Sequence, residues 1–114
     1  MKEAMINCEL GDDVFEDDPT VNHMQNYMAD FFGKEKAILL PSGTQSNLCS
    51  LLVNVPLKGS AAIIGNRSHI YNYERGGIAA LGNICPLVIE NLQDGTFDLE
   101  VLEKMIPIQN VHLP

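Results

Sequence analysis

Leu39-Leu40-Pro41-Ser42-Gly43-Thr44-Gln45-Ser46-Asn47 is the stretch of this sequence that decides the fold. It joins an apolar, strand-like run, Ala37–Leu40, to a helix-like run, Asn47–Val53. The Ser42-Gly43-Thr44 triplet between them therefore places free backbone amides and two hydroxyl groups at a helix N-terminus. Helix N-termini carry unpaired N–H donors and a partial positive charge, so the triplet predicts a site for a phosphorylated ligand. A helix cap without any ligand is equally compatible with it.

Working outward from this stretch, apolar runs predict two more strands, at Ala61–Gly65 and Ile84–Ile89. A first helix is predicted before them, with Asp18 as its N-cap, Pro19 in its first turn and Gly33 at its end. Two more are predicted: Tyr71–Leu81, which is loosened by Gly76-Gly77, and Asp98–Met105, which Pro107 stops. Strands that alternate with helices indicate the α/β class with a mainly parallel sheet. Residues 1–17 are acidic and predict an irregular segment.

Composition narrows the classes of partner. The 114 residues carry a formal net charge of −8, which argues against nucleic acid or an anionic membrane as partner, and no stretch is apolar for long enough to span a bilayer. Cys8, Cys49 and Cys85 are too scattered for a zinc site, and no metal is expected. We interpret them as buried, reduced thiols of an intracellular, cytoplasmic protein.

A second polar segment, Asn66-Arg67-Ser68-His69, follows the strand predicted at Ala61–Gly65. Ligands of open α/β sheets bind beyond the carboxyl ends of the strands, so the Ser42-Gly43-Thr44 triplet and His69 are expected at one edge. A phosphate cradle and an imidazole at that edge would form a cofactor site. A solvated or structural histidine is compatible with the same position. The P-loop and the Gly-x-Gly-x-x-Gly dinucleotide motif are absent from the sequence.

Four segments follow one another in an order that suggests a known family. They are Gly11–Thr20, Phe32–Glu35, Pro41–Thr44, and Ser68–Ile70 with Glu74. Together they resemble the low-specificity L-threonine aldolases, pyridoxal-phosphate (PLP) enzymes of the aspartate-aminotransferase fold type I. The resemblance runs over nearly the whole chain. It implies that residues 1–114 are the N-terminal part of a larger, three-layer αβα domain. The apolar faces that three strands and a few helices would leave uncovered, and the absence of a natural stop over residues 108–114, agree with that expectation.

The resemblance also assigns roles to individual residues. It implies that Ser42, Gly43 and Thr44 hold the phosphate of PLP. It implies that His69 stacks on the pyridine ring as a catalytic residue near the substrate hydroxyl. Residues behind or on the substrate side of this site would be Tyr71, Tyr73 and Glu74. The Gly11–Thr20 loop would help to shape the site across a subunit interface. The family has glycine where this chain has Glu16, so a positive φ there would strain the loop.

The implied parent activity is retro-aldol cleavage of L-threonine or L-allo-threonine to glycine and acetaldehyde, in threonine catabolism and glycine biosynthesis. The family places its Schiff-base lysine beyond the position of Pro114, and we interpret the lysines present as solvated surface charges: Lys2, Lys34, Lys36, Lys58 and Lys104. We therefore expect the isolated chain to be inactive and to form a homo-oligomer or to pair with a full-length homologue. Two alternatives stay open: another fold type I enzyme, such as an aminotransferase or β-eliminating lyase, and a non-catalytic interaction subunit or pseudoenzyme.

Overall fold

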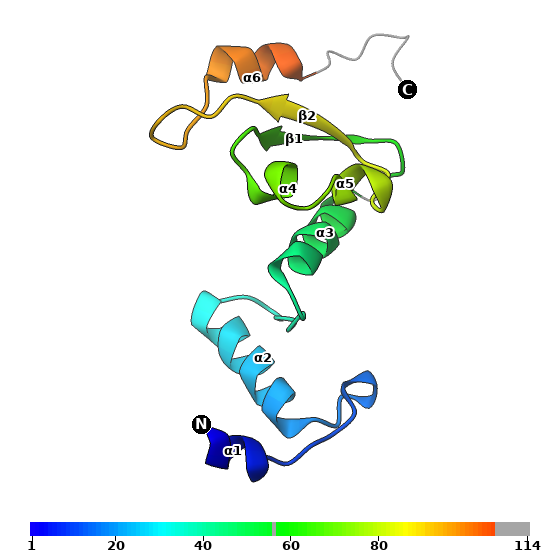
Figure 1. Cartoon of the computed structure of the whole chain (residues 1–114), viewed down its shortest axis with the longest axis vertical. Coiled ribbons are helices and arrows are strands. Elements are labelled where there is room, and N and C mark those ends of the chain that lie inside the picture. The colour runs from blue at the N-terminus through cyan, green and yellow to red at the C-terminus, as the bar shows by residue number, and fades with distance from the viewer. Residues whose placement is uncertain (56, 107–114) are drawn as a thin grey trace. The chain divides into compact units, whose positions relative to one another are not determined.

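The computed structural model describes residues 1–55 and 57–106. The chain forms two compact units, Met1–Pro41 and Ser42–Pro114, and each is described here by itself (Figure 1). Pro107, which was expected to stop the last helix, and the tail at residues 108–114 lie outside the described residues. Within the described ranges, none of the helices combines the length and the apolar character needed to cross a bilayer.

The first unit is helical. Its elements are α1 (Lys2–Ile6), the 3₁₀ turn η1 (Asp13–Phe15) and α2 (Pro19–Phe32). The Asp18 carboxylate caps α2 by accepting hydrogen bonds from the amides of Thr20 and Val21, both at 3.0 Å. The helix ends at Gly33, where φ is 59°. The predicted helix from Pro19 to Gly33 is thus confirmed, whereas the irregular segment expected before it contains two short helical turns.

Asp18 also closes the acidic loop that precedes α2. Its second carboxylate oxygen accepts a hydrogen bond from the Gly11 amide at 3.2 Å. Inside the loop, the Val14 amide donates to Asp12 Oδ1 at 2.9 Å. The backbone passes so close to itself that a Cβ atom on Gly11 would lie 2.3 Å from the carbonyl carbon of Asp17. Only glycine fits at this crossing, because the opposing atoms are backbone and cannot turn away.

Glu16 lies in the left-handed region, with φ at 58°. Its carbonyl oxygen accepts a hydrogen bond from Asn22 Nδ2 at 2.6 Å, which ties this conformation to the first turns of α2. Side chains with a Cβ atom pay a steric cost in this region, and glycine does not. The strain expected from a glutamate at this position is therefore present in the loop.

The strand predicted at Ala37–Leu40 is wrong. The segment is not a strand, and the described part of the chain gives it no neighbouring strand. Its Leu39 amide instead donates to Gln25 Oε1 of α2 at 2.9 Å. Apolar sequence alone indicates an extended run, but a strand also needs a partner for its backbone groups.

The second unit contains the sheet. Its elements are α3 (Gly43–Asn54), β1 (Ala61–Gly65), α4 (His69–Asn72), α5 (Gly77–Ala80), β2 (Cys85–Ile89) and α6 (Leu99–Met105). The two strands are parallel, in a register that runs from Ala61 opposite Cys85 to Gly65 opposite Ile89. Helices α4 and α5 form the crossover between them, and in Figure 1 they lie below the sheet while α6 lies above it. This βαβ unit confirms the predicted α/β class with a parallel sheet.

The helix predicted over Tyr71–Leu81 is broken into two single turns, α4 and α5. Arg75 and Gly76, between them, both have positive φ angles, 54° and 70°. Two successive left-handed residues end a right-handed helix, so the chain reverses here. This reversal follows directly after Glu74.

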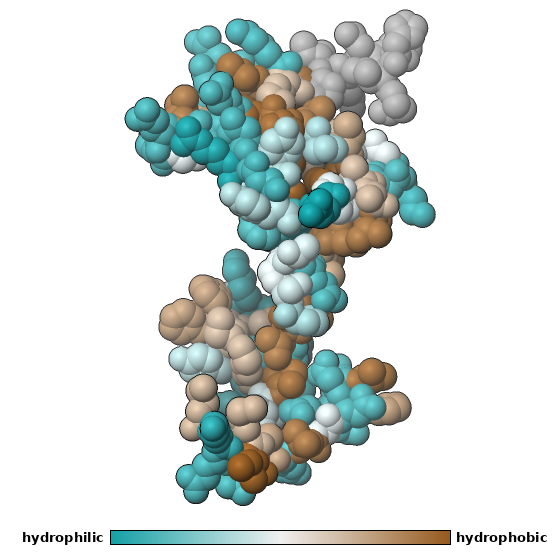
Figure 2. Space-filling model, viewed as in Figure 1, coloured by the Kyte–Doolittle hydropathy of each residue, from teal (hydrophilic) through white to brown (hydrophobic). Residues whose placement is uncertain are grey.

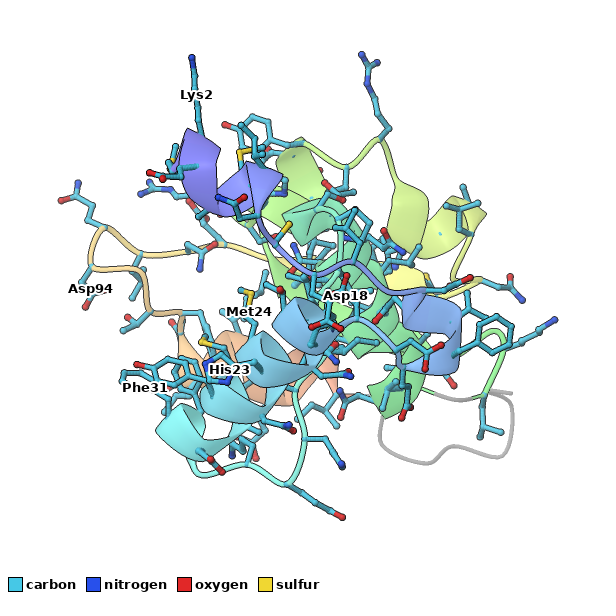
Figure 3. The ribbon with its side chains drawn as sticks, turned by 90° about the horizontal axis from the view of Figure 1, so that it is seen from below. Lys2, Asp18, His23, Met24, Phe31 and Asp94 are labelled. Carbon is cyan, nitrogen blue, oxygen red and sulfur yellow. The ribbon has the colours of Figure 1, made fainter. Side chains whose placement is uncertain are left out.

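The core of the second unit is small. Ile64, Ile78 and Ile84 are buried together, and partly buried apolar side chains pack against them: Leu51, Val55, Ala62 and Ile70. Many other apolar side chains are exposed, as Figure 2 shows for both units. In the first unit, Met24 and Phe31 project from α2 (Figure 3). The uncovered apolar surface predicted from the sequence is thus present.

The expected burial of the thiols is wrong at two positions. Cys8 and Cys85 are exposed, and Cys49 is half-buried. Cys85 opens β2, a strand in which only Ile89 is buried. Cys8 follows α1, a helix without a buried residue. Apolar residues next to a cysteine in the sequence are therefore not sufficient to predict that its thiol is buried.

Replacing Glu16 by glycine is expected to stabilise the first unit by about 1 kcal/mol, because it relieves the left-handed strain. Urea unfolding of the 114-residue chain measures the change. Asp17→Gly is the matched control: it removes the same charge next door, at a residue that is not among those with positive φ. We expect the control to be neutral or destabilising, and equal stabilisation by both variants would contradict the assignment of strain.

The cap of α2 is expected to weaken in acid. Hydrogen bonds from the backbone amides of Val21, Gly11 and Thr20 hold the pKa of Asp18 below its ordinary value of 3.8, although desolvation opposes them. A depressed pKa contributes stability that is present above the ordinary value and is lost as the pH falls through the folded-state value. The amide signals of Gly11 and Val21, followed by NMR from pH 6 to pH 2, should report this loss. Asp18→Asn should remove the titration, and an unchanged transition in that variant would refute it.

Candidate functional site

The Ser42-Gly43-Thr44 triplet opens α3 as the sequence predicted. Ser42 is the N-cap, and its Oγ accepts a hydrogen bond from the Gln45 amide at 3.2 Å. Ser46 Oγ donates to the Ser42 carbonyl oxygen at 3.2 Å, which tightens the turn. The amides of Gly43 and Thr44 occupy the first turn, where no carbonyl of the helix can reach them. Both residues are exposed, and the space beside Gly43 is open to at least 4 Å.

This geometry satisfies both interpretations of the triplet. Ser42 is a working helix cap, and the two amides beyond it still point out of a twelve-residue helix as anion donors.

His69 begins α4 at the carboxyl end of β1. The hydroxyl oxygen of Ser68 caps this turn by accepting a hydrogen bond from the Tyr71 amide at 3.3 Å. The loop before it is tied to the neighbouring strand, since the Asn66 amide donates to the Ile89 carbonyl at 2.8 Å. The imidazole therefore stands at the sheet edge where the sequence placed it.

Two asparagines lock this edge reciprocally. The Arg67 amide donates to Asn91 Oδ1 at 3.0 Å, and the Asn91 amide donates to Asn66 Oδ1 at 2.9 Å. Gly65 makes room for the lock, because a Cβ atom there would lie 2.2 Å from Asn91 Oδ1. A shallow cavity of about 280 Å³ lies beside it and is lined in part by Arg67, Ser68 and Gln93. The backbone leading to His69 is thus fixed from both strands.

Glu74 is the one buried charged residue within the described ranges, with 8% of its surface exposed. Its Oε1 receives two contacts: Asn47 Nδ2 at 2.7 Å and His69 Nδ1 at 2.8 Å. Burial raises the pKa of Glu74, but the hydrogen bonds from Asn47 and His69 and the charge of a protonated His69 outweigh it, so the pKa lies below the ordinary value of 4.5. Glu74 is therefore a carboxylate at neutral pH.

The Glu74 contact orients the His69 ring. A carboxylate only accepts hydrogen bonds, so Nδ1 carries the proton in this contact. The other ring nitrogen, Nε2, is left with a lone pair in the neutral imidazole. The His69 side chain keeps 57% of its surface exposed, so the ring is open to a ligand. The geometry gives a histidine backed by a buried carboxylate, which is an arrangement suited to general base chemistry.

The two tyrosines of this segment differ. The Tyr73 ring lies against His69, with ring centroids 5.3 Å apart and planes inclined at 47°, and is largely exposed. Tyr71 contributes its backbone amide to the Ser68 cap, and its ring is half-exposed. The structure thus brings Tyr73 and Glu74 each into contact with His69, whereas Tyr71 contributes through its backbone.

Asn47 is the residue of this cluster that the sequence analysis did not single out. It lies on α3, one helical turn beyond Gly43, and so connects the helix that carries the triplet to the Glu74–His69 pair. The sequence carries no local signal for this role, because a buried carboxylate requires donors but Glu74 lies 27 residues from Asn47.

The profile of the β-eliminating lyase family matches residues 1–114. The chain belongs to this family. Its relatives include the low specificity L-threonine aldolase of Escherichia coli K12, to which it is 46% identical over 112 residues, covering 98% of this chain and 33% of the relative. Low-specificity L-threonine aldolase 1 of Arabidopsis thaliana is 45% identical over 106 residues, covering 93% of this chain and 30% of the relative. The resemblance to threonine aldolases stated above is confirmed.

This chain is also similar to a protein with another named activity. The alanine racemase TOXG of Cochliobolus carbonum is 32% identical over 81 residues, which cover 71% of this chain and 21% of that protein. The chain spans about a third of the length of the threonine aldolases that it matches. Its fold is therefore an α/β portion of this family's domain.

Replacing Gly65 by alanine is expected to displace Asn91 and to destabilise the second unit by about 1 to 3 kcal/mol, the usual cost of overpacking. Thermal unfolding and the amide signal of Arg67 measure the effect. Gly77→Ala is the control, because no atom lies within 4 Å of the added methyl group and the residue is helical with a negative φ. If both variants melt alike, the close approach at Gly65 does not hold the edge together.

Proposed function

We propose that this chain is the N-terminal part of a PLP-dependent threonine aldolase, which cleaves L-threonine or L-allo-threonine to glycine and acetaldehyde. The observation that carries the proposal is the His69–Glu74–Asn47 cluster, in which an exposed imidazole is oriented by a buried carboxylate beside the helix that opens with Ser42-Gly43-Thr44. Two threonine aldolases that are 45–46% identical to nearly the whole chain support it.

The residues present fit one end and one face of PLP. The exposed amides of Gly43 and Thr44 and the Ser42 hydroxyl would hold the phosphate, since open space surrounds Gly43. The exposed His69 ring would stack on the pyridine ring. When bound, PLP supplies an electron sink for the pair of electrons left on the substrate Cα.

His69 then supplies the proton chemistry. With Nδ1–H held by Glu74, Nε2 can accept the proton of the substrate β-hydroxyl. The C–O bond becomes a carbonyl as the Cα–Cβ bond breaks, so acetaldehyde leaves and the bonding electrons remain on Cα. Protonation of Cα gives glycine, and atoms and charge balance. Tyr73, against the open side of the His69 ring, would limit the orientations of a bound amino acid.

The alternative from another class is a non-catalytic subunit that pairs with a full-length homologue. In this alternative the partner would supply the Schiff-base lysine, because the five lysines of this chain are exposed on the surface and none lies in the His69 cluster. The exposed apolar side chains fit such a partner, or a homo-oligomer, equally well. We also propose that the protein is cytoplasmic, as part of the threonine aldolase proposal and not of this alternative.

A chimera decides between these possibilities. The 112 residues of the Escherichia coli relative that match this chain are replaced by the corresponding residues of this chain. We expect the chimera to release acetaldehyde from L-threonine, whereas the isolated 114-residue chain releases none. In the chimera, His69→Asn should lower kcat by about 10²-fold or more, which is the usual contribution of a positioned base.

His23→Asn is the matched control, because His23 projects from α2 as an exposed side chain (Figure 3). It should leave kcat unchanged. A folded chimera that shows the absorbance of bound PLP but forms no acetaldehyde would favour the interaction subunit. Acetaldehyde from the isolated chain would overturn its predicted inactivity.

A further inference from the structure

We propose that Asn47 is a positioning residue, which keeps Glu74 as an acceptor so that His69 holds its proton on Nδ1 and presents Nε2 as the basic nitrogen. That a substrate hydroxyl meets Nε2 rests on the proposed function. The control of the ring by Asn47 does not, because it follows from the contacts within this chain.

Both donors converge on one oxygen atom. Asn47 Nδ2 and His69 Nδ1 lie 2.7 and 2.8 Å from Glu74 Oε1, and the Glu74 side chain is 3% exposed. Within the described residues, no fully buried side-chain nitrogen or oxygen lacks a hydrogen-bond partner, and this includes the buried atoms of the cluster. A satisfied buried network of this kind has little freedom to rearrange.

Two proton arrangements would satisfy the contact between Glu74 and His69. In one, the carboxylate accepts from Nδ1–H, and Nε2 is basic. In the other, a protonated Glu74 donates to Nδ1, and the proton of the ring sits on Nε2. The second arrangement offers a substrate a donor instead of a base. The protonation state of Glu74 therefore decides which nitrogen of His69 can accept a proton.

Asn47 favours the first arrangement. Its amide group donates to Oε1, and a donor stabilises the charged carboxylate more than the neutral acid. Burial acts in the opposite direction by raising the pKa of Glu74, and it is the largest single influence on that group. Removing the Asn47 amide leaves burial less opposed, so Glu74 should take up a proton from solvent more readily. The second arrangement, which holds that additional proton, should then gain population.

The location of Asn47 gives this control a second consequence. Asn47 lies one turn along α3 from Gly43, on a twelve-residue helix whose start is capped by Ser42. One rigid helix would thus fix the positions of both an anion bound at the start of α3 and the basic nitrogen of His69. Sites whose groups share rigid elements keep their spacing better than sites built on loops.

The test uses the ¹⁵N-labelled 114-residue chain at neutral pH, with no cofactor or substrate. Long-range ¹H–¹⁵N correlations of the His69 ring report the ratio of the two tautomers. We expect the Nδ1–H form to dominate in the wild type. Asn47→Leu should lower that ratio by about tenfold or more, the scale of one hydrogen bond to a charged group. The ¹³C signal of the Glu74 carboxyl group should titrate at higher pH in the same variant.

Asn54→Leu is the matched control. Asn54 lies on the same helix, but its amide donates to the Ser50 carbonyl at 2.8 Å and not to Glu74. Asn47→Gln, which retains an amide donor, should restore part of the wild-type ratio. If the branched leucine prevents folding, Asn47→Met offers an apolar side chain that adapts more readily. The dispersion of the amide spectrum shows that each variant is folded.

A wild-type ring that is mainly Nε2–H, or a ratio that Asn47→Leu and Asn47→Met leave unchanged, would overturn the proposal. Because the measurement involves no PLP and no threonine, its outcome does not depend on whether the proposed function is correct. A chimera that cleaves threonine together with an unchanged tautomer ratio would keep the function and reject the role of Asn47. The reverse pair of results would keep the role of Asn47 and reject the function.

Discussion

The second unit is organised around a single buried carboxylate. Removing a charge from water costs several kcal/mol unless donors compensate, so Glu74 requires both the α3 amide of Asn47 and the imidazole of His69 at its Oε1. This requirement draws three segments together: a helix, the turn after β1 and the reversal before α5. The small apolar core of Ile64, Ile78 and Ile84 could not alone dictate where these polar groups meet. The carboxylate therefore helps to specify a single arrangement of these segments, because the apolar core is small.

The sequence predicted well those elements whose signals are local. The caps at Ser42 and Asp18 could be read from residue type, because a short side chain with an oxygen atom at a helix start has one favourable use. The strand at Ala61–Gly65 was also found with its bounds, since apolar residues between turn signals suffice. His69 could be placed at the end of a strand for the same reason, whereas Ser42, Gly43 and Thr44 could be placed only at the start of a helix, because the strand expected before them is absent.

The errors concern features that depend on distant partners. Ala37–Leu40 has the composition of a strand, but pairing is decided by another segment. The helix over Tyr71–Leu81 was expected to be loosened at Gly76-Gly77, and the left-handed Gly76 agrees with that expectation. The full break was missed because arginine has no preference for the left-handed conformation that Arg75 adopts. Asn47 was missed because its importance derives from Glu74, 27 residues away, and becomes visible only when the chain is folded.

The side chains of Asn91 and Asn66 accept hydrogen bonds from the backbone amides of Arg67 and Asn91, respectively. These two bonds affect the register in which β1 and β2 pair. The β1 and β2 segments are short and uniformly small or apolar, so their side chains discriminate poorly between pairings displaced along the strand. The two bonds span 24 and 25 residues and form together only when Gly65 is opposite Ile89. A displaced pairing would leave both side-chain oxygens without these donors. The two asparagines thus add a polar contribution to the choice of register, which the small and apolar side chains of the strands specify only weakly.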